Sequence, residues 1–436
     1  MAKYTRQDIL ELIDEEDIEF IRLQFTDISG NLKNMATTID QLDKILDGHY
    51  KFDCAAIDGF RGTGYEELFL VPDLDTFVIF PWRPQHGKVA RFLCDVVKPD
   101  GTPFDGDSRY ILKKVISEAK ELGYEFKVAI KNEFFLFDLG ENGEPTNHSS
   151  EQGGYFDVGP ADGGENARRD MVLYLADMGI SVETSYHSDE SAQHVLDLSY
   201  ADALDMADNI MTSRLVIRTV AKRHGVNATF MPKPKKDTKG SGAHYTFTLF
   251  KDGKNVFLTN REVAESFIEG VLTYIDEITM FMNPLTNSYA RFGSFEAPKY
   301  VAWSNTNRSQ LVRIPAAPDA NKRVEIRSAD PSCSPYAALT LLLNAGIYGI
   351  EHKLPVRKPI EQTLYKAPCG VTDGLASLPN SLYEAVELGA SSSFVRSVLP
   401  EYAVKTYVDE KRKECMSYLQ ADNKTEYEID KYFETV

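Results

Sequence analysis

The 436-residue sequence predicts an α+β fold built from two domains, and three observations lead to that prediction. Short runs of apolar residues typical of strands occur repeatedly within the first hundred positions. The segment 98–103, KPDGTP, is rich in turn-forming residues and indicates a boundary. Beyond it, strand-like runs are interspersed with longer stretches of helical periodicity. We therefore expect a small mixed domain over residues 1–103 and a larger domain over residues 104–436.

In the first domain, Thr5 predicts the start of a helix, because its hydroxyl can cap a run of apolar residues at helical spacing. Residues 19–26 alternate between apolar and polar side chains, which is typical of a strand, and residues 29–31, SGN, predict a turn after it. Residues 77–80 and 89–97 are two further strand candidates, separated by a turn rich in proline and glycine. The first domain is thus expected to combine a helix with several strands.

In the second domain, a helix is expected to begin at Ser108 and to run through Leu122. Strand-like runs and helical periodicity then alternate to about residue 281. The expected helices are 166–178, 201–224 and 262–281, and the expected strands are 126–137, 180–185, 193–198, 228–231 and 243–250. Residues 336–350 are apolar but too few to cross a membrane, which indicates a buried helix.

Composition and charge narrow the classes of function. The formal net charge is −18 at pH 7, which disfavours nucleic acid and anionic membranes as partners. An anionic ligand would need a local cluster of cations, and the segment 291–327 provides five arginines. The cysteines are scattered without a CxxC motif, no apolar stretch reaches 18 residues, and the first residues lack an apolar signal-like segment. These features predict a reduced protein of the cytoplasm.

Several segments carry a resemblance to a known family, and they occur in that family's order. They are Arg22–Asp27, Val71–Leu74, Phe77–Trp82, Pro99–Pro103, Gly154–Asp157, Phe230–Pro234, Gly240–Gly242, Asn307–Ser309, Arg313–Pro315 and Arg323–Ser328. From Tyr4 to about Ile350 the sequence resembles the type I alpha branch of glutamine synthetase. The resemblance implies a β-grasp-like N-terminal domain and a large α/β catalytic domain of the glutamine synthetase/guanido kinase-like type, with an antiparallel sheet. It also implies a homo-oligomer of two stacked hexameric rings, a dodecamer.

The resemblance further implies an ATP-dependent ligase of nitrogen metabolism. In the family, ATP phosphorylates the γ-carboxylate of glutamate, and ammonia then displaces the phosphate. Divalent ions, Mg²⁺ or Mn²⁺, lie in a cage of carboxylates and neutralise the phosphoryl oxygens. ATP is therefore a candidate cofactor.

The residues expected to bind substrate and phosphate are carried over from the matching segments. Arg291 matches a contact to the glutamate carboxylate, and Arg308 and Arg327 match contacts to phosphoryl and carboxylate oxygens. Arg313 and Arg323 match contacts to the nucleotide phosphates. Guanidinium groups suit such bidentate anions. Any single arginine could instead be a solvated surface residue, but five at matching positions favour binding.

Five further positions complete the expected site. Glu183 matches a nucleotide-side position, and Gly240 lies in a substrate loop in which Lys239 replaces an asparagine. Asp53 matches an ammonium-binding acid that a neighbouring subunit donates. Glu296 matches a glutamate on a flap that closes the site and takes a proton from the amine.

The expected metal cage departs from the family pattern. Three of its six ligand positions are kept, and three that are glutamates in the family are changed. The kept residues are Glu133, His244 and Glu325, and the changed ones are Lys131, Ser188 and Val195. We therefore expect a degenerate metal site with weak binding of Mg²⁺ or Mn²⁺. One way to restore the cage is a displaced acid: Glu190 and Asp197 have the parity to face the site on a strand, whereas Asp189 would point away.

Lys131 has two further interpretations. It could take the place of a metal as the positive charge beside a phosphate or carboxylate. It could also form only a salt bridge, with Glu133 or Glu325. The second added lysine, Lys239, favours a pocket remade for an anion.

These expectations favour a family member with little or no ordinary ATP- and metal-dependent glutamine synthesis. Such a pseudoenzyme would bind a small anion or amino acid, or would act as the partner of a true glutamine synthetase. Two alternatives stay open. One is an active, divergent ATP-dependent carboxylate–amine ligase that joins glutamate to ammonia or another amine. The other is metal-independent chemistry on a γ-glutamyl-like substrate.

Overall fold

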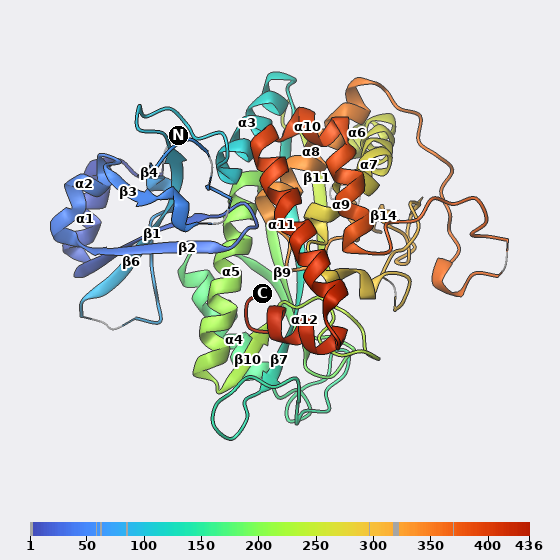
Figure 1. Cartoon of the computed structure of the whole chain (residues 1–436), viewed down its shortest axis with the longest axis horizontal. Coiled ribbons are helices and arrows are strands. Elements are labelled where there is room, and N and C mark those ends of the chain that lie inside the picture. The colour runs from blue at the N-terminus through green and yellow to red at the C-terminus, as the bar shows by residue number, and fades with distance from the viewer. Residues whose placement is uncertain are drawn as a thin grey trace.

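The structure is a computed structural model that describes residues 3–57, 59–61, 63–83, 86–295, 297–316, 322–368 and 370–436. A small N-terminal domain lies beside a larger domain built around a long sheet, and helices cover the larger sheet (Figure 1). Each domain has its own apolar core: one is centred on residues such as Ile21 and Phe92, the other on residues such as Phe134 and Leu339. The predicted α+β class is confirmed.

The N-terminal sheet has the strand order β2-β1-β6-β4-β3, with β5 paired to β6, and its central pair β1 and β6 is parallel. Its strands are β1 (Ile18–Thr26), β2 (Leu32–Thr38), β3 (Tyr50–Asp53), β4 (Glu67–Pro72), β5 (Val78–Ile79) and β6 (Lys88–Val97). Two helices accompany it, α1 (Arg6–Glu15) and α2 (Leu42–Leu46). Thr5 caps α1 in a reciprocal capping box with Asp8, as predicted from the sequence.

The large sheet has the order β13-β14-β15-β11-β7-β9-β8, and its long central pairs are antiparallel. Its strands are β7 (Glu125–Asp138), β8 (Val182–His187), β9 (Gln193–Asp202), β10 (Val226–Thr229), β11 (Ala243–Lys251), β12 (Lys254–Asn255), β13 (Trp303–Ser304), β14 (Val312–Arg313) and β15 (Val324–Ile326). Strand β10 adds to β7, and β12 adds to β11. The sheet therefore brings segments from residue 125 to residue 326 side by side.

Helices of the larger domain pack on this sheet and on one another (Figure 1). They are α3 (Ser108–Glu121), α4 (Glu165–Asp177), α5 (Ala203–Arg223), α6 (Val256–Thr259), α7 (Arg261–Met282), α8 (Pro335–Glu351), α9 (Leu382–Ser391), α10 (Ser393–Val398), α11 (Glu401–Gln420) and α12 (Lys424–Tyr432). Ser334 caps α8, whose apolar side chains are almost all buried, so the predicted buried helix is confirmed. Among the described residues, no helix combines the length and apolarity needed to cross a bilayer.

Three strands differ from their predicted bounds by two residues or more. Strand β8 begins and ends two residues after the predicted 180–185, β10 lies two residues before the predicted 228–231, and β9 continues four residues beyond the predicted end at 198. Pairing with β7 determines the last two cases, because β10 runs against residues 135–138 and β9 pairs with it as far as Asp202. Local apolar runs do not contain this information.

A buried charge network joins the two domains. Arg109 of α3 donates to Asp208 of α5 at 2.8 Å, and its other nitrogen lies 2.7 Å from Asp95 of β6. Asp73 accepts from the same guanidinium at 2.8 Å, and the Tyr336 hydroxyl donates to Asp208 at 2.6 Å. A buried cation with three acidic partners resists separation of the elements that carry them.

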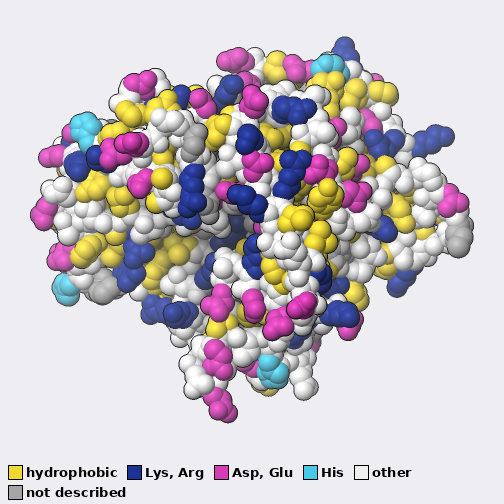
Figure 2. All heavy atoms as spheres, viewed as in Figure 1, with side chains coloured by type: hydrophobic (Ala, Val, Ile, Leu, Met, Phe, Trp, Pro, Cys, Tyr) yellow, Lys and Arg dark blue, Asp and Glu magenta, His cyan; other side chains and the backbone are white. Residues whose placement is uncertain are grey.

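On the surface, acidic and basic side chains are interspersed, and Lys and Arg gather around a hollow near the centre of the face in Figure 2. The surplus of negative charge is therefore not uniform over this face.

Candidate active site

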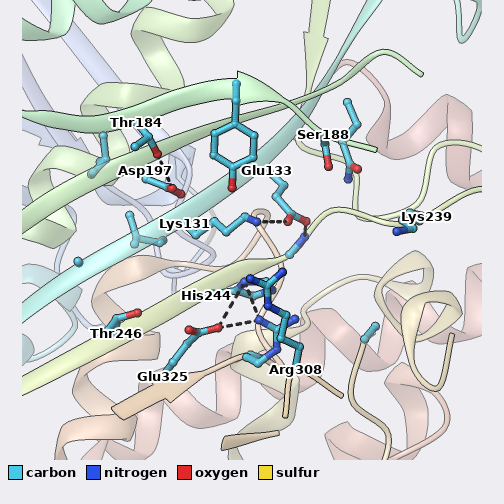
Figure 3. A pocket seen from close by; sticks show the side chains of 18 of the residues that line it. Lys131, Glu133, Thr184, Ser188, Asp197, Lys239, His244, Thr246, Arg308 and Glu325 are labelled. Atoms are coloured by element: carbon cyan, nitrogen blue, oxygen red, sulfur yellow. Dashed lines mark hydrogen bonds and ion pairs between the residues drawn. The ribbon is translucent and has the colours of Figure 1, made fainter. Parts of the chain in front are cut away.

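Three neighbouring strands, β11, β7 and β9, place three candidate site residues in one row across the sheet. In the register of the sheet, His244 of β11 lies opposite Lys131 of β7, and Lys131 lies opposite Asp197 of β9. Glu133 is two residues further along β7, and it therefore faces the same side as Lys131. The sheet thus carries an imidazole, a lysine and two acidic groups along one wall of a cavity (Figure 3).

The cavity has a volume of about 400 Å³ and collects most of the residues predicted for the site. The predicted residues that line it are Lys131, Glu133, Glu183, Ser188, Lys239, Gly240, His244, Arg291, Arg308, Arg313, Arg323, Glu325 and Arg327. Seven lining side chains are Lys or Arg and five are Asp or Glu, so the wall is cationic in a chain with a net charge of −18. Such a cavity is suited to an anionic ligand.

Lys131 lies between the acidic groups of this wall. Its Nζ is 3.6 Å from Glu133 Oε1 (Figure 3). The same Nζ is 5.3 Å from the centre of the Tyr186 ring. Burial lowers the pKa of Lys131, but Glu133, Tyr186 and Asp197 raise it by more, so the amine stays protonated. The ion pair with Glu133 predicted as one alternative is therefore present.

Glu325 is held by two guanidinium groups. Its Oε2 accepts from Arg313 at 2.8 Å, and its Oε1 accepts from Arg327 at 2.7 Å. Burial raises the pKa of Glu325, but the two arginines lower it further than burial raises it, and the carboxylate is ionised. Arg313 on β14 and Arg327 beyond β15 thereby converge on one acid.

His244 is a neutral imidazole. Burial lowers its pKa well below the ordinary value, and the nearby charges of Arg327, Lys131, Arg291 and Arg313 lower it further. Its Nδ1 lies 3.9 Å from Glu325 Oε1. An uncharged imidazole beside an ionised carboxylate is a donor set that divalent cations bind.

Glycines in the segment 240–242 allow a close approach to this centre. A Cβ at Gly242 would lie 2.7 Å from His244 Nε2, and a Cβ at Gly240 would lie 2.5 Å from Arg291 Cγ. The Gly242 amide donates to Glu133 Oε2 at 2.7 Å. Arg291 itself is buried and donates to the backbone carbonyls of Ser328 and Ala329. Side chains at either glycine would displace the groups that form the cavity.

The segment between β8 and β9 corrects one prediction. Asp189 was expected to point away from the site, but it lines the cavity and forms an ion pair with Lys239. The expectation assumed a continuous strand, whereas β8 ends at His187 and the strand alternation stops there. The carboxylate of Glu190 accepts from the Lys239 amide at 3.1 Å. Asp197 lines the cavity and accepts from the Thr184 hydroxyl.

Three predicted positions lie elsewhere. Val195 is fully buried and pairs with Glu133 on one side and with Tyr186 on the other, so it supplies only packing. Asp53 is exposed at the end of β3, where its carboxylate accepts from the Ala55 amide, and it does not line this chain's own cavity. Glu296 lies outside the described residues.

A second cluster adjoins Ser188, because its His187 donates to the Ser188 carbonyl. The ligand atoms of Glu151, His187 and His194 lie within 4.8 Å of one another, which is close enough to hold a metal ion. Arg168 donates to His194 Nδ1 at 2.8 Å, and this leaves the ring proton on Nε2, toward Glu151. Burial lowers the pKa of His194 to about 3. The arrangement as it stands is a hydrogen-bonded network.

Several cavity residues were missed by the sequence analysis. Tyr155, Tyr186 and Tyr200 line the cavity, as do Thr246 and Phe295. Tyr155 comes from a loop, so no strand alternation could have placed its side chain. For Tyr186, an available signal was its place two residues before the changed position Ser188, directly after a predicted strand.

Comparisons with known proteins agree with this geometry. The family model for the glutamine synthetase catalytic domain matches residues 105–432, and the model for the glutamine synthetase β-grasp domain matches residues 17–99. The chain is 47% identical over 431 residues to a glutamine synthetase of Clostridium saccharobutylicum, with 96% of each chain covered. It is 43% identical over 439 residues to a glutamine synthetase of Staphylococcus aureus strain Mu50, with 98% of each covered.

Solved structures give the same fold. A complex of GmaS with ADP superposes with a TM-score of 0.87 at 25% identity, covering 97% of this chain and 98% of that one. A Plasmodium falciparum glutamine synthetase superposes with a TM-score of 0.85 at 22% identity, covering 98% and 99%. The predicted combination of a β-grasp domain with a glutamine synthetase catalytic domain is confirmed.

The comparisons overturn the functional prediction of a repurposed chain without ordinary ligase activity. Relatives named glutamine synthetase match nearly end to end at 43–47% identity, and nothing in them indicates a loss of activity. That prediction was wrong because it weighed three changed ligand positions above the similarity of the whole chain. The chain belongs to the glutamine synthetase family.

Proposed function

We propose that the chain is an active ATP-dependent carboxylate–amine ligase that joins ammonia, or another small amine, to the side-chain carboxylate of glutamate. One observation carries the proposal: five arginines converge on one cavity around His244 and Glu325 in a chain 47% identical to a glutamine synthetase. Assignment to the type I branch is part of the proposal and rests on the order of the matching segments.

The reaction needs an activated carboxylate. The γ-phosphoryl group of ATP passes to a carboxylate oxygen, and the nitrogen lone pair of the amine then attacks the carbonyl carbon and displaces phosphate. Arg308, Arg323 and Arg327 suit phosphoryl oxygens, and buried Arg291 suits the substrate carboxylate. Because these cations are already placed by the fold, little reorganisation is needed when negative charge develops.

His244 and Glu325 fit one divalent cation. The imidazole is neutral, the carboxylate is ionised, and their nearest ligand atoms are 3.9 Å apart. Such an ion would supply positive charge to the phosphoryl oxygens. Lys131 stands beside this pair, and Glu133 is engaged by Lys131 and by the Gly242 amide.

We further propose that the chain works as a homo-oligomer of two stacked hexameric rings. The exposed position of Asp53, away from this chain's own cavity, supports a role in the cavity of a neighbouring subunit. Light scattering should then give a mass about twelve times 49.0 kDa.

The central test is an activity assay that quantifies all three products. It uses the purified full chain with ATP, glutamate, ammonium and Mg²⁺ or Mn²⁺. Glutamine, ADP and phosphate should form in equal amounts at a rate of about 1 s⁻¹ or more. Omission of glutamate or of the metal is the control, and methylamine in place of ammonium tests the amine. A folded, assembled protein without turnover under any of these conditions would contradict the proposal.

A further inference from the structure

Lys131 is the cation that the long central strands of the sheet, β9, β7 and β11, contribute to the cavity wall. The arginines of the cavity come from the segment 291–327, which contains the end of a 3-10 helix, loops and short strands, whereas Lys131 lies in the middle of β7, with β11 and β9 on its two sides. A residue on a central strand is held more firmly than one on a loop. Its position in the cavity is therefore set by the register of three strands.

The surroundings of Lys131 leave it oriented toward the cavity. On its own strand it faces Glu133, on β9 it faces Asp197, and on β8 it contacts the ring of Tyr186. At 3.6 Å, the contact with Glu133 is an ion pair and not a short hydrogen bond. About one third of the Lys131 side chain is exposed, in contrast to the 13% exposed side chain of Glu133.

Lys131 also adds to the excess of positive charge on the cavity wall. With it, seven cationic and five acidic side chains line the cavity. An acid at the same position would bring the two counts to equality, and a bound anion would then depend on added cations. An ammonium is a compact charge with rotatable donors, which can follow an oxygen of either a phosphate or a carboxylate.

We propose that Lys131 donates directly to an anionic oxygen of the ligand, and that it allows the cavity to bind this anion before any divalent ion is present. The inference rests on the proposed function and adds a specificity-determining contact to it. The ligand oxygen belongs either to the phosphates of ATP or to the carboxylates of glutamate, and two arms of one experiment separate these sources.

The experiment is isothermal titration calorimetry on the full chain in EDTA, with ATP in one arm and L-glutamate in the other. It compares the unchanged protein with Lys131→Gln, Lys131→Arg and the control Lys127→Gln. Lys127 lies on the same strand with an equal charge, but it pairs with Asp202 outside the cavity. Circular dichroism and particle mass establish that each variant is folded and assembled.

The expected result is binding by the unchanged protein in EDTA and a loss of about tenfold or more in affinity for Lys131→Gln in at least one arm. Lys131→Arg and Lys127→Gln should stay close to the unchanged protein. The arm that responds identifies the ligand oxygen.

Three results would overturn the inference. The first is equal affinity of Lys131→Gln and the unchanged protein in both arms, and the second is an equal loss in Lys131→Arg, which would assign the effect to shape and not to charge. The third is ATP and glutamate binding that requires added Mg²⁺, which would leave the proposed ligase function intact. Absence of ATP binding even with Mg²⁺ would instead contradict the proposed function itself.

Discussion

Arg327 donates to the carboxylate of Glu325 at 2.7 Å, and the two side chains share one face of the chain because they are two residues apart at the end of β15. Arg313 holds the other oxygen of the same carboxylate. Glu325 is therefore the point at which two arginines proposed to bind phosphate meet the imidazole proposed to bind a metal ion. An anionic ligand that engages the arginines would leave this carboxylate available to a cation.

Replacing Glu325 by glutamine should lower ligase activity on the order of 100-fold, because the neutral amide neither orients both arginines nor binds a divalent ion. ADP release and Mn²⁺ affinity, measured on the same preparations, should fall together. The control is Glu401→Gln, an exposed glutamate at the start of α11. Full activity in Glu325→Gln would show that the carboxylate has no part in the reaction.

The proposed sharing of sites between subunits predicts complementation. Asp53→Asn and Glu325→Gln should each have strongly reduced activity alone, since one lacks the donated acid and the other lacks the cavity acid. Co-expressed at equal levels, they should recover activity, because about one quarter of the sites then combine two unchanged partners. A different affinity tag on each variant allows the mixed assemblies to be purified, and their ligase activity is then measured. If mixed assemblies stay as inactive as the parents, Asp53 does not act across an interface.

The network around Arg109 predicts a large effect on stability. Asp208→Asn removes the charge that pairs with a buried guanidinium, and breaking such a pair costs about 3–5 kcal/mol. Urea unfolding at fixed protein concentration measures the loss in unfolding free energy. The control is Asp409→Asn, which removes an exposed partner of Lys405. It should lower the unfolding free energy by about 1 kcal/mol or less. Equal effects of the two substitutions would mean that the network contributes no more than a surface pair.

The pair of His187 and Glu151 predicts a dependence of stability on pH. Burial lowers the pKa of His187, but the hydrogen bonds to Glu151 and to the Ser188 carbonyl raise it above 6.5. A histidine whose pKa is raised in the folded state stabilises fully below pH 6.5, and this stabilisation is lost as the pH rises through the folded-state pKa. His187→Gln should therefore lose more unfolding free energy, relative to the unchanged protein, at pH 6 than at pH 9.

The matched control for this prediction is His86→Gln, because His86 is exposed and lies 3.5 Å from Asp17. Its unfolding free energy should follow that of the unchanged protein at both pH values. A loss in His187→Gln that is the same at pH 6 and pH 9 would show that the imidazole acts only through packing.

The sequence by itself determined most of the longer elements up to residue 281 and most residues of the site. The start of the helix after Thr5 and both ends of the helix from Ser108 were predicted to within about two residues. Thirteen predicted site residues meet in one cavity, and they had been carried over from segments that resemble glutamine synthetase. The class of fold followed from strand-like alternation and helical periodicity.

Tertiary structure alone decided how the groups face one another. The end of β8 at His187 turned Asp189 into the cavity, and pairing with β7 placed Asp197 opposite Lys131. Glu151 joined His187 across 36 positions of the chain. These relationships depend on strand register and on contacts between distant segments, and a local pattern of apolar and polar residues specifies neither.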